Sequence, residues 1–147
     1  LNKSRQYEDN LFPKYVMGEA MASGDSYDGV KMHALELAKV NLVAGIIQDE
    51  VRSLFQNAVA KGAFTQEQVE SIIQNLETSK LLISQNIGTT ITVLEFYRTL
   101  ANKNIEVLVR IACKSYSVKE IIKKMIRSGL GNSDELLLKK IDEILDS

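Results

Sequence analysis

The feature that most constrains this chain is one long stretch, from about residue 25 to residue 61, that contains no proline and is apolar around most of its circumference. Its apolar residues recur at three- and four-residue spacings, which is the period of an α-helix. A helix that is apolar on most sides normally lies at the centre of a domain, surrounded by neighbours. Gly62 follows as a C-terminal stop. Because an unbroken helix of this length would be about 50 Å long, we expect a kink or break near Gly29 or Gly45.

The remaining apolar stretches have helical spacing as well, and no segment alternates clearly enough between apolar and polar residues to compete as a strand. The strongest local signal is a capping box formed by Thr65 and Gln68, with Phe64 and Val69 as its hydrophobic staple. Gly88 interrupts the helix that begins there, and a new helix is expected from about Thr90. The expected helices cover about 13–22, 25–61, 65–87, 90–101, 105–112, 117–129 and 132–145.

The sequence therefore predicts an all-α fold, a bundle of about seven helices. A solvated arm is expected over residues 1–10 and a single helical domain over 11–147. A length of 147 residues with 45% apolar composition is sufficient for one core. The scarcity of aromatic residues and the presence of one proline and eight glycines favour helices over a sheet.

Charge and cysteine content limit the partners and the compartment. Eighteen basic and nineteen acidic residues give a net charge of −1, so nothing draws the whole chain to nucleic acid or to an anionic membrane. Cys113 is the only cysteine, which rules out an internal disulfide and favours a reducing compartment. No apolar stretch is long enough to span a membrane, and residues 1–10 do not resemble a signal peptide. A cytoplasmic location is expected.

No set of residues in the sequence indicates catalysis or a cofactor. His33 is the only histidine, so zinc sites, di-iron helical bundles and catalytic triads would all lack ligands or partners. Phosphate-binding and nucleophile-elbow motifs do not occur. We therefore expect no enzyme, no metal and no cofactor.

One segment is strongly basic. Lys114, Lys119, Lys123, Lys124 and Arg127 are opposed there by a single acidic residue. With the following helix, this segment could be read as a helix-turn-helix. The last helix is mainly acidic, however, which is the wrong sign for entering a major groove. A basic helix lying against an acidic one, within one chain or across a dimer, explains these charges better.

Two cations fall within otherwise apolar helical stripes. Arg98 lies four residues after Leu94, and Lys80 lies four residues after Leu76. Such a charge either reaches water at the edge of the stripe or meets the head group of an anionic, otherwise apolar ligand. Arg98 and Lys80, with the single histidine His33, are the candidate ligand-binding residues.

The central half of the chain resembles the non-haem globin sensor domains of the stress and sporulation signalling proteins of bacilli. The resemblance covers about residues 30–100 and is carried by the segments 34–38, 46–55, 64–67 and 72–98. It implies a globin-like bundle without haem, which holds a fatty-acid-like ligand and forms a homodimer through its C-terminal helices. It also implies a part in the signalling of a sporulation sensor kinase.

Three functional hypotheses follow. The leading one is a non-enzymatic sensor that holds a fatty-acid-like ligand in a helical cavity and signals to another protein. The alternative is a protein-interaction or adaptor module with no small ligand. The third is a small DNA-binding regulator.

Overall fold

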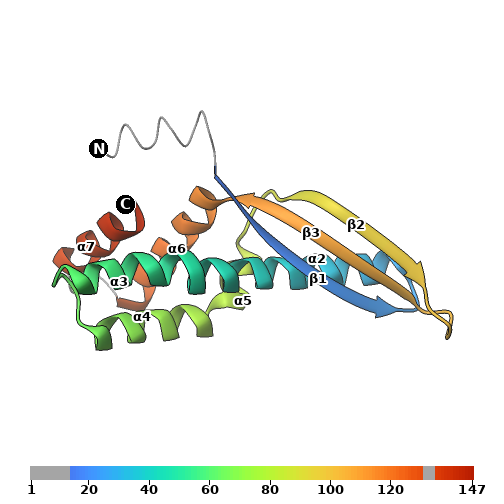
Figure 1. The fold of residues 1–147 in the computed structure, drawn as a ribbon, viewed down its shortest axis with the longest axis horizontal. Coiled ribbons are helices and arrows are strands. Elements are labelled where there is room, and N and C mark those ends of the chain that lie inside the picture. Colours follow the sequence, from blue (N-terminus) through green and yellow to red (C-terminus); the bar gives the residue numbers. More distant parts are fainter. Residues whose placement is uncertain (1–13, 131–134) are drawn as a thin grey trace.

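The computed structural model describes residues 14–130 and 135–147, and it shows an elongated molecule of mixed α/β structure (Figure 1). A three-stranded antiparallel sheet occupies one end and a group of helices the other. The all-α prediction is therefore wrong, and so is the seven-helix globin-like bundle. The elements in chain order are β1 (Tyr15–Gly24), α2 (Tyr27–Gly45), a π-helical segment η1 (Ile46–Val51), α3 (Arg52–Ala60), α4 (Gln66–Thr78), α5 (Lys80–Gln85), β2 (Ile91–Thr99), β3 (Ile105–Lys114), α6 (Ser115–Leu130) and α7 (Glu135–Leu145).

The sheet has the order β1-β3-β2, so the last strand in the sequence lies at its centre. β1 pairs with β3 along its whole length, with Tyr15 opposite Lys114 and Gly24 opposite Ile105. β2 pairs with the other edge of β3, with a register shift near Val93. Three predicted helices, at 13–22, 90–101 and 105–112, are therefore strands over most of their length. Residues 1–13 lie outside the described residues, and with them the expected solvated arm.

Helix α2 packs on one face of the sheet, chiefly beneath β1 and β3. Small residues allow this close approach, because Gly18 of β1 has no side chain where α2 passes. A Cβ atom at Gly18 would lie 2.2 Å from the Ala38 carbonyl oxygen and 2.6 Å from the Leu42 Cβ. Ala34 and Ala38, the residues of α2 nearest the sheet, are fully buried.

The long helix predicted for residues 25–61 is confirmed, because α2, η1 and α3 follow one another without interruption from Tyr27 to Ala60. The predicted kink or break near Gly29 or Gly45 does not interrupt the helix; instead, the π-helical segment η1 begins at Ile46, the residue after Gly45. We call this continuous helical segment, Tyr27–Ala60, the rod. Its buried side chains lie mostly four or five residues apart, as at Leu42, Ile47, Val51 and Phe55. A π-helical turn contains more residues than an α-helical turn, so η1 keeps these side chains on one side.

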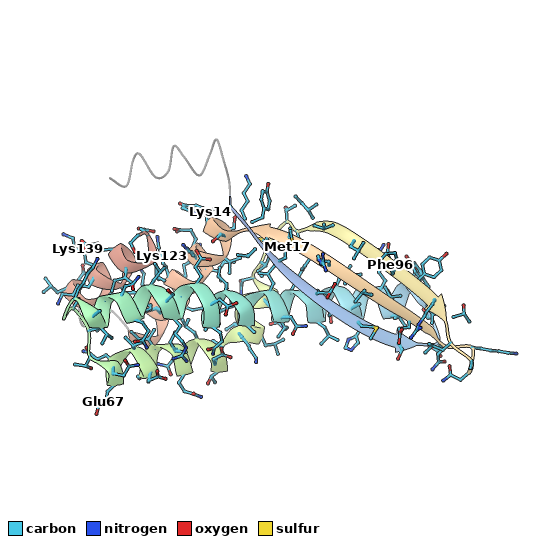
Figure 2. All side chains as sticks on the ribbon, viewed as in Figure 1. Lys14, Met17, Glu67, Phe96, Lys123 and Lys139 are labelled. Carbon is cyan, nitrogen blue, oxygen red and sulfur yellow. The ribbon has the colours of Figure 1, made fainter. Side chains whose placement is uncertain are left out.

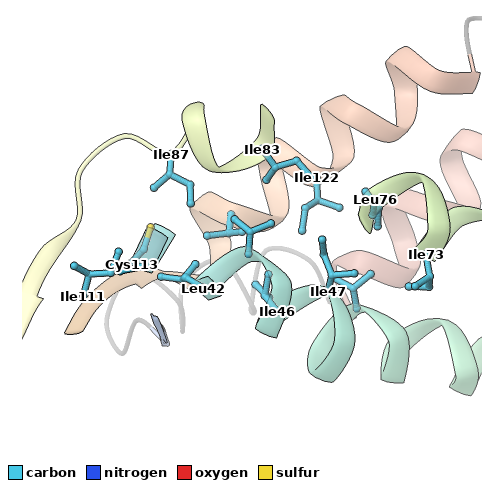
Figure 3. Packing of buried hydrophobic residues seen from close by; sticks show 14 of the residues in the cluster. Leu42, Ile46, Ile47, Ile73, Leu76, Ile83, Ile87, Ile111, Cys113 and Ile122 are labelled. Carbon is cyan, nitrogen blue, oxygen red and sulfur yellow. The ribbon is translucent and has the colours of Figure 1, made fainter. Parts of the chain in front are cut away.

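The main core lies where this rod passes from the sheet to the helical end of the molecule. Figure 3 shows side chains from the rod, α4, the region of α5, β3 and α6 converging there. Phe55 packs edge-to-face on Phe64, with ring centroids 5.7 Å apart. The fully buried side chains at this end include Ile47, Val51, Phe55, Ile73, Leu76, Ile83, Ile122, Ile141 and Leu145.

The predicted start of α4 is confirmed in atomic detail. The Thr65 hydroxyl accepts from the Gln68 backbone N–H, and the Gln68 side chain accepts from the Thr65 backbone N–H. Phe64 and Val69 are both buried in the core. The predicted start of a helix at Ser117 is wrong, because α6 begins at Ser115 directly after β3. Within the described residues, no helix is both long enough and apolar enough to cross a membrane.

Candidate interaction surface

The two faces of the sheet differ sharply in what covers them. Alternate residues of β1 and β3 point toward α2 and are mostly buried, whereas the residues between them point to the opposite side, on which none of the helices within residues 14–130 and 135–147 packs. Figure 2 shows the side chain of Phe96 pointing away from α2 on this side. We call this side the open face, and it carries Tyr15, Met17, Glu19, Met21 and Ser23 of β1, Glu106, Leu108, Arg110, Ala112 and Lys114 of β3, and Ile91, Leu94, Phe96 and Arg98 of β2.

The open face carries several large apolar side chains that are exposed to solvent over more than half of their surface. Met17 is 58% exposed, Met21 55%, Ile91 53% and Phe96 61%. The register brings Met21, Leu108 and Phe96 side by side in one row across the three strands. Apolar side chains gathered in this way on a regular sheet are typical of a surface that another molecule covers.

Charged rows alternate with the apolar rows on the same face. Arg110 donates to the Glu19 carboxylate at 3.1 Å, and Arg98 donates to the Glu106 carboxylate at 2.7 Å. Each carboxylate is thus balanced by a guanidinium on the neighbouring strand. The two charged pairs have no net charge, so this part of the face favours a partner surface that is also without net charge over a polyanion.

Strand β2 is the least covered element of the sheet. It lies mostly beyond α2, and on the helix side it is held by Tyr27 and Lys31. The Tyr27 hydroxyl donates to Glu95 at 2.6 Å, and the Tyr27 ring packs edge-to-face on Tyr97. This hydrogen bond lowers the pKa of Glu95, with a further contribution from Lys31, and it raises the pKa of Tyr27. Val93 and Tyr97 stay largely exposed.

An open hollow of about 360 Å³ lies where the sheet meets α6. Its lining combines Tyr15 and Ile91 with the polar side chains of Thr89, Lys114 and Ser117. The hollow adjoins the open face, since Tyr15, Ile91 and Lys114 belong to both. It differs from the enclosed, helix-lined cavity that was expected for a fatty-acid-like ligand.

The three predicted ligand-binding residues lie on three different elements. Arg98 lies on β2, is largely exposed and pairs with Glu106. Lys80 is the first residue of α5 and pairs with Glu77 at 3.7 Å. His33 is exposed on α2. The helical stripe that singled out Arg98 does not exist, because residues 91–99 form a strand. The described residues therefore give no support for a ligand site shared by these three side chains.

Three of the five cations in the basic segment pair with acidic residues of the same chain, as the charge pattern indicated. Lys119 pairs with Glu50 of η1 at 2.7 Å. Lys123 and Arg127 of α6 pair with Asp146 and Asp142 in the C-terminal segment. Burial opposes the charge on Lys123, but the hydrogen bonds to Asp146 and Glu120 outweigh it and raise the pKa of the ammonium. The turn expected between α6 and α7 lies outside the described residues.

The C-terminal helices, which the globin-like resemblance implied as a dimer contact, are packed within their own chain. Leu138, Ile141 and Leu145 of α7 are buried, and α7 contacts α3 and α6. Leu136 is the large apolar residue that α7 leaves exposed. The described part of these helices thus offers a much smaller apolar surface than the open face.

Nucleophile and metal chemistry find little support in the geometry. Cys113 is buried on β3, and burial raises the pKa of its thiol, which disfavours the reactive thiolate. His33 lies on the exposed side of α2, on a different element. Among residues 14–130 and 135–147, no group of three or more His, Cys, Asp or Glu side chains is arranged to hold a metal ion.

Sequence reasoning named two residues of the open face, Arg98 as a ligand-binding candidate and Lys114 as part of the basic segment, and it assigned no role to the other residues of this face. The missed signal was the β-branched alternation of Ile105, Val107, Val109 and Ile111, which indicates a strand buried on one face. Comparison with known proteins adds no identification. No protein-family model matches the chain, and a search of curated proteins finds no match, so membership of the globin sensor family stays a prediction.

Proposed function

We propose that this protein is a non-enzymatic binding module that docks another protein through the open face of its sheet. The observation that carries the proposal is the exposed row formed by Met21, Leu108 and Phe96, with a second apolar row of Met17, Ala112 and Ile91 beyond the Glu19–Arg110 pair. Methionine and aromatic side chains are enriched at protein interfaces, and methionine adapts its shape to a partner.

A protein partner fits this surface better than the other partners considered. The charged pairs Glu19–Arg110 and Arg98–Glu106 are internally balanced, which gives nucleic acid no phosphate-binding stripe on this part of the face. The main basic side chains of α6 are held in ion pairs with acidic residues. These observations favour the adaptor hypothesis over the DNA-binding one. A cytoplasmic location stays a prediction, supported by the single buried thiol of Cys113.

The test is affinity capture with an immobilised variant. The double substitution Met21→Glu and Phe96→Glu places two carboxylates in the centre of the open face, where a docked protein would have to desolvate them. Extract from the source cells is passed over the wild type and over the variant, and bound proteins are quantified by mass spectrometry. We expect the partner to be recovered at least about tenfold less by the variant, as for the loss of a hot spot.

The matched control is Leu136→Glu, which introduces a carboxylate at an exposed leucine of α7, away from the sheet. This variant should capture the partner as the wild type does. Circular dichroism spectra and unfolding midpoints establish that all variants are folded. Equal capture by the wild type and the folded double variant would contradict the proposal.

A further inference from the structure

We infer that the protein docked on the open face is a second copy of this chain, packed face to face across a two-fold axis that passes beside Leu108. This inference rests on the proposed function of the open face. It comes from the pattern that the central strand presents there, which is Glu106, Leu108 and Arg110 at alternate positions. The three residues read acid, apolar, base along the strand.

Such a triplet is complementary to itself when it is reversed. If the two-fold axis runs across the strands at Leu108, the second copy lies antiparallel over the first. Leu108 then faces Leu108, and Arg110 of each copy faces Glu106 of the other. An interface with this symmetry repeats every contact twice, so both ends of the triplet are satisfied together.

The flanking strands extend the same complementarity. Arg110 is already paired with Glu19 at 3.1 Å, and Glu106 with Arg98 at 2.7 Å. Facing copies would join these pairs into alternating rows of four charges, in the order Glu19, Arg110, then Glu106 and Arg98 of the second copy. Long arginine and glutamate side chains suit the spacing of about 10 Å between packed sheets.

The same axis stacks the apolar row on itself. Met21, Leu108 and Phe96 of one copy would cover the same three residues of the other, with the charged rows on either side. An apolar centre inside a polar rim is the usual anatomy of a protein interface.

The size of the face sets the expected strength of the dimer. With the axis at Leu108, the strands of the two copies overlap over about seven residues, Ile105–Ile111 of β3 and their neighbours, and three strands spaced about 4.8 Å apart present a flat area of roughly 330 Å² over that length. Stable complexes usually bury about 800 Å² on each partner. We therefore expect a reversible dimer with a dissociation constant in the micromolar range.

The first measurement is sedimentation equilibrium of the wild-type chain over a wide concentration range. The expected result is a monomer–dimer equilibrium that Leu136→Glu leaves unchanged. A wild type that stays monomeric at every concentration overturns the inference, whatever the variants do. If the capture experiment still yields a different protein that needs Met21 and Phe96, the proposed function stands and only the identity of the partner is wrong.

The second measurement uses charge reversal and mixing. A dimer of the Arg110→Glu variant would place two carboxylates opposite each other at both contacts, and a dimer of the Glu106→Arg variant would place two guanidinium groups there. Each variant alone should therefore dimerise at least about tenfold more weakly than the wild type. In a heterodimer of the two variants both contacts are complementary again, because the introduced glutamate at position 110 faces the introduced arginine at position 106, and the native Glu106 of one chain faces the native Arg110 of the other. Heterodimers should therefore form with an affinity close to that of the wild type.

Heterodimer formation on mixing distinguishes this arrangement from other dimers. If the copies paired through the edge of β2 or through α7, mixing these two variants would restore nothing, because residues 106 and 110 would not face each other. Failure of the folded variants to recover on mixing overturns the face-to-face arrangement. If either variant fails to fold, Met21→Glu takes over the test of the face itself, because it places two carboxylates opposite each other on the axis and should weaken the dimer at least about tenfold, and a dimer that forms as tightly as that of the wild type overturns the inference.

Discussion

At the scale of single residues, the close approach of helix and sheet depends on Gly18. Its missing side chain leaves the backbone of β1 in contact with the backbone of α2, since a Cβ there would lie 2.8 Å from the Leu42 backbone nitrogen. The obstacle is backbone and Cβ, neither of which can move out of the way by a change of rotamer. Glycine at this position is therefore a packing requirement.

We expect Gly18→Ala to lower the free energy of unfolding by about 1–3 kcal/mol or more, the usual cost of overpacking. Urea denaturation followed by circular dichroism measures the change. The control is Gly45→Ala, because Gly45 has helical backbone angles and a Cβ there meets nothing within 4 Å. That variant should be stabilised by about 0.5–1 kcal/mol. Similar effects of the two substitutions would show that α2 and β1 are not in close contact.

A second prediction at this scale concerns pH and the bond from Tyr27 to Glu95. The pKa of Glu95 is lowered from 4.5, so its contribution to stability is present above that value and is lost as the pH falls. The pKa of Tyr27 is raised from 10.0, so its contribution is present below that value and is lost as the pH rises through the raised pKa.

Tyr27→Phe should therefore flatten the stability profile at both ends of the pH range, with Lys31 retaining part of the effect on Glu95. The measurement is the unfolding midpoint of the wild type and the variant from about pH 3 to pH 11, the range that spans both groups. Tyr116→Phe, at an exposed tyrosine of α6, serves as the control and should leave the profile unchanged. A Tyr27→Phe profile parallel to that of the wild type would argue against the bond.

At the scale of elements, the sequence predicted the helical end of the molecule well. The rod from Tyr27 to Ala60 and the capped start of α4 were both recognised. In the rod and in α4, the apolar residues recur only with the spacing of a helix. In α4, the capping box also marks the residue at which the helix begins. Local chemistry was enough to identify them.

The strands escaped recognition because the open face is itself apolar. In β3, Ile105 fits a helical stripe together with Leu108 and Ala112 of the open face, while Val107 and Val109, on the α2 side like Ile105, fit a buried strand. When both faces of a strand carry apolar residues, the alternation of period two disappears. The side chains that obscured the strand pattern are among those that form the proposed binding surface. Neither the strands nor this surface could be found without knowing that the three strands pair.

The pairing of α6 with α7 also leads to a prediction at the element scale. Lys123 is 13% exposed and binds Glu120 and Asp146, so Lys123→Met removes a largely buried cation that two carboxylates share. We expect a loss of about 1–2 kcal/mol of unfolding free energy. Lys124→Met is the matched control on the exposed side of α6 and should change stability by less than about 0.5 kcal/mol. Equal effects of the two variants in urea denaturation would contradict the ion-pair account.

At the scale of the whole molecule, the helical end and the sheet end differ in how far their apolar side chains are covered. The helical end buries most of its apolar side chains among the rod, α4, α6 and α7, and it leaves Leu81 and Leu82 of α5 and Leu136 of α7 exposed singly or in a pair. The sheet end has a helix on one face and exposed methionine and aromatic side chains on the other. This asymmetry is the physical basis for assigning a binding role to the open face.

The most direct test follows the methyl groups of the four methionines by NMR in the presence of a soluble paramagnetic probe. Met17 and Met21 lie on the open face, 58% and 55% exposed, and Met32 lies on α2, 65% exposed, as an internal control. In dilute protein all three signals should broaden strongly. As concentration rises, Met17 and Met21 should become protected while Met32 stays accessible. If Met17 and Met21 remain as accessible as Met32 at every concentration and in the presence of any captured partner, the open face is not a binding surface.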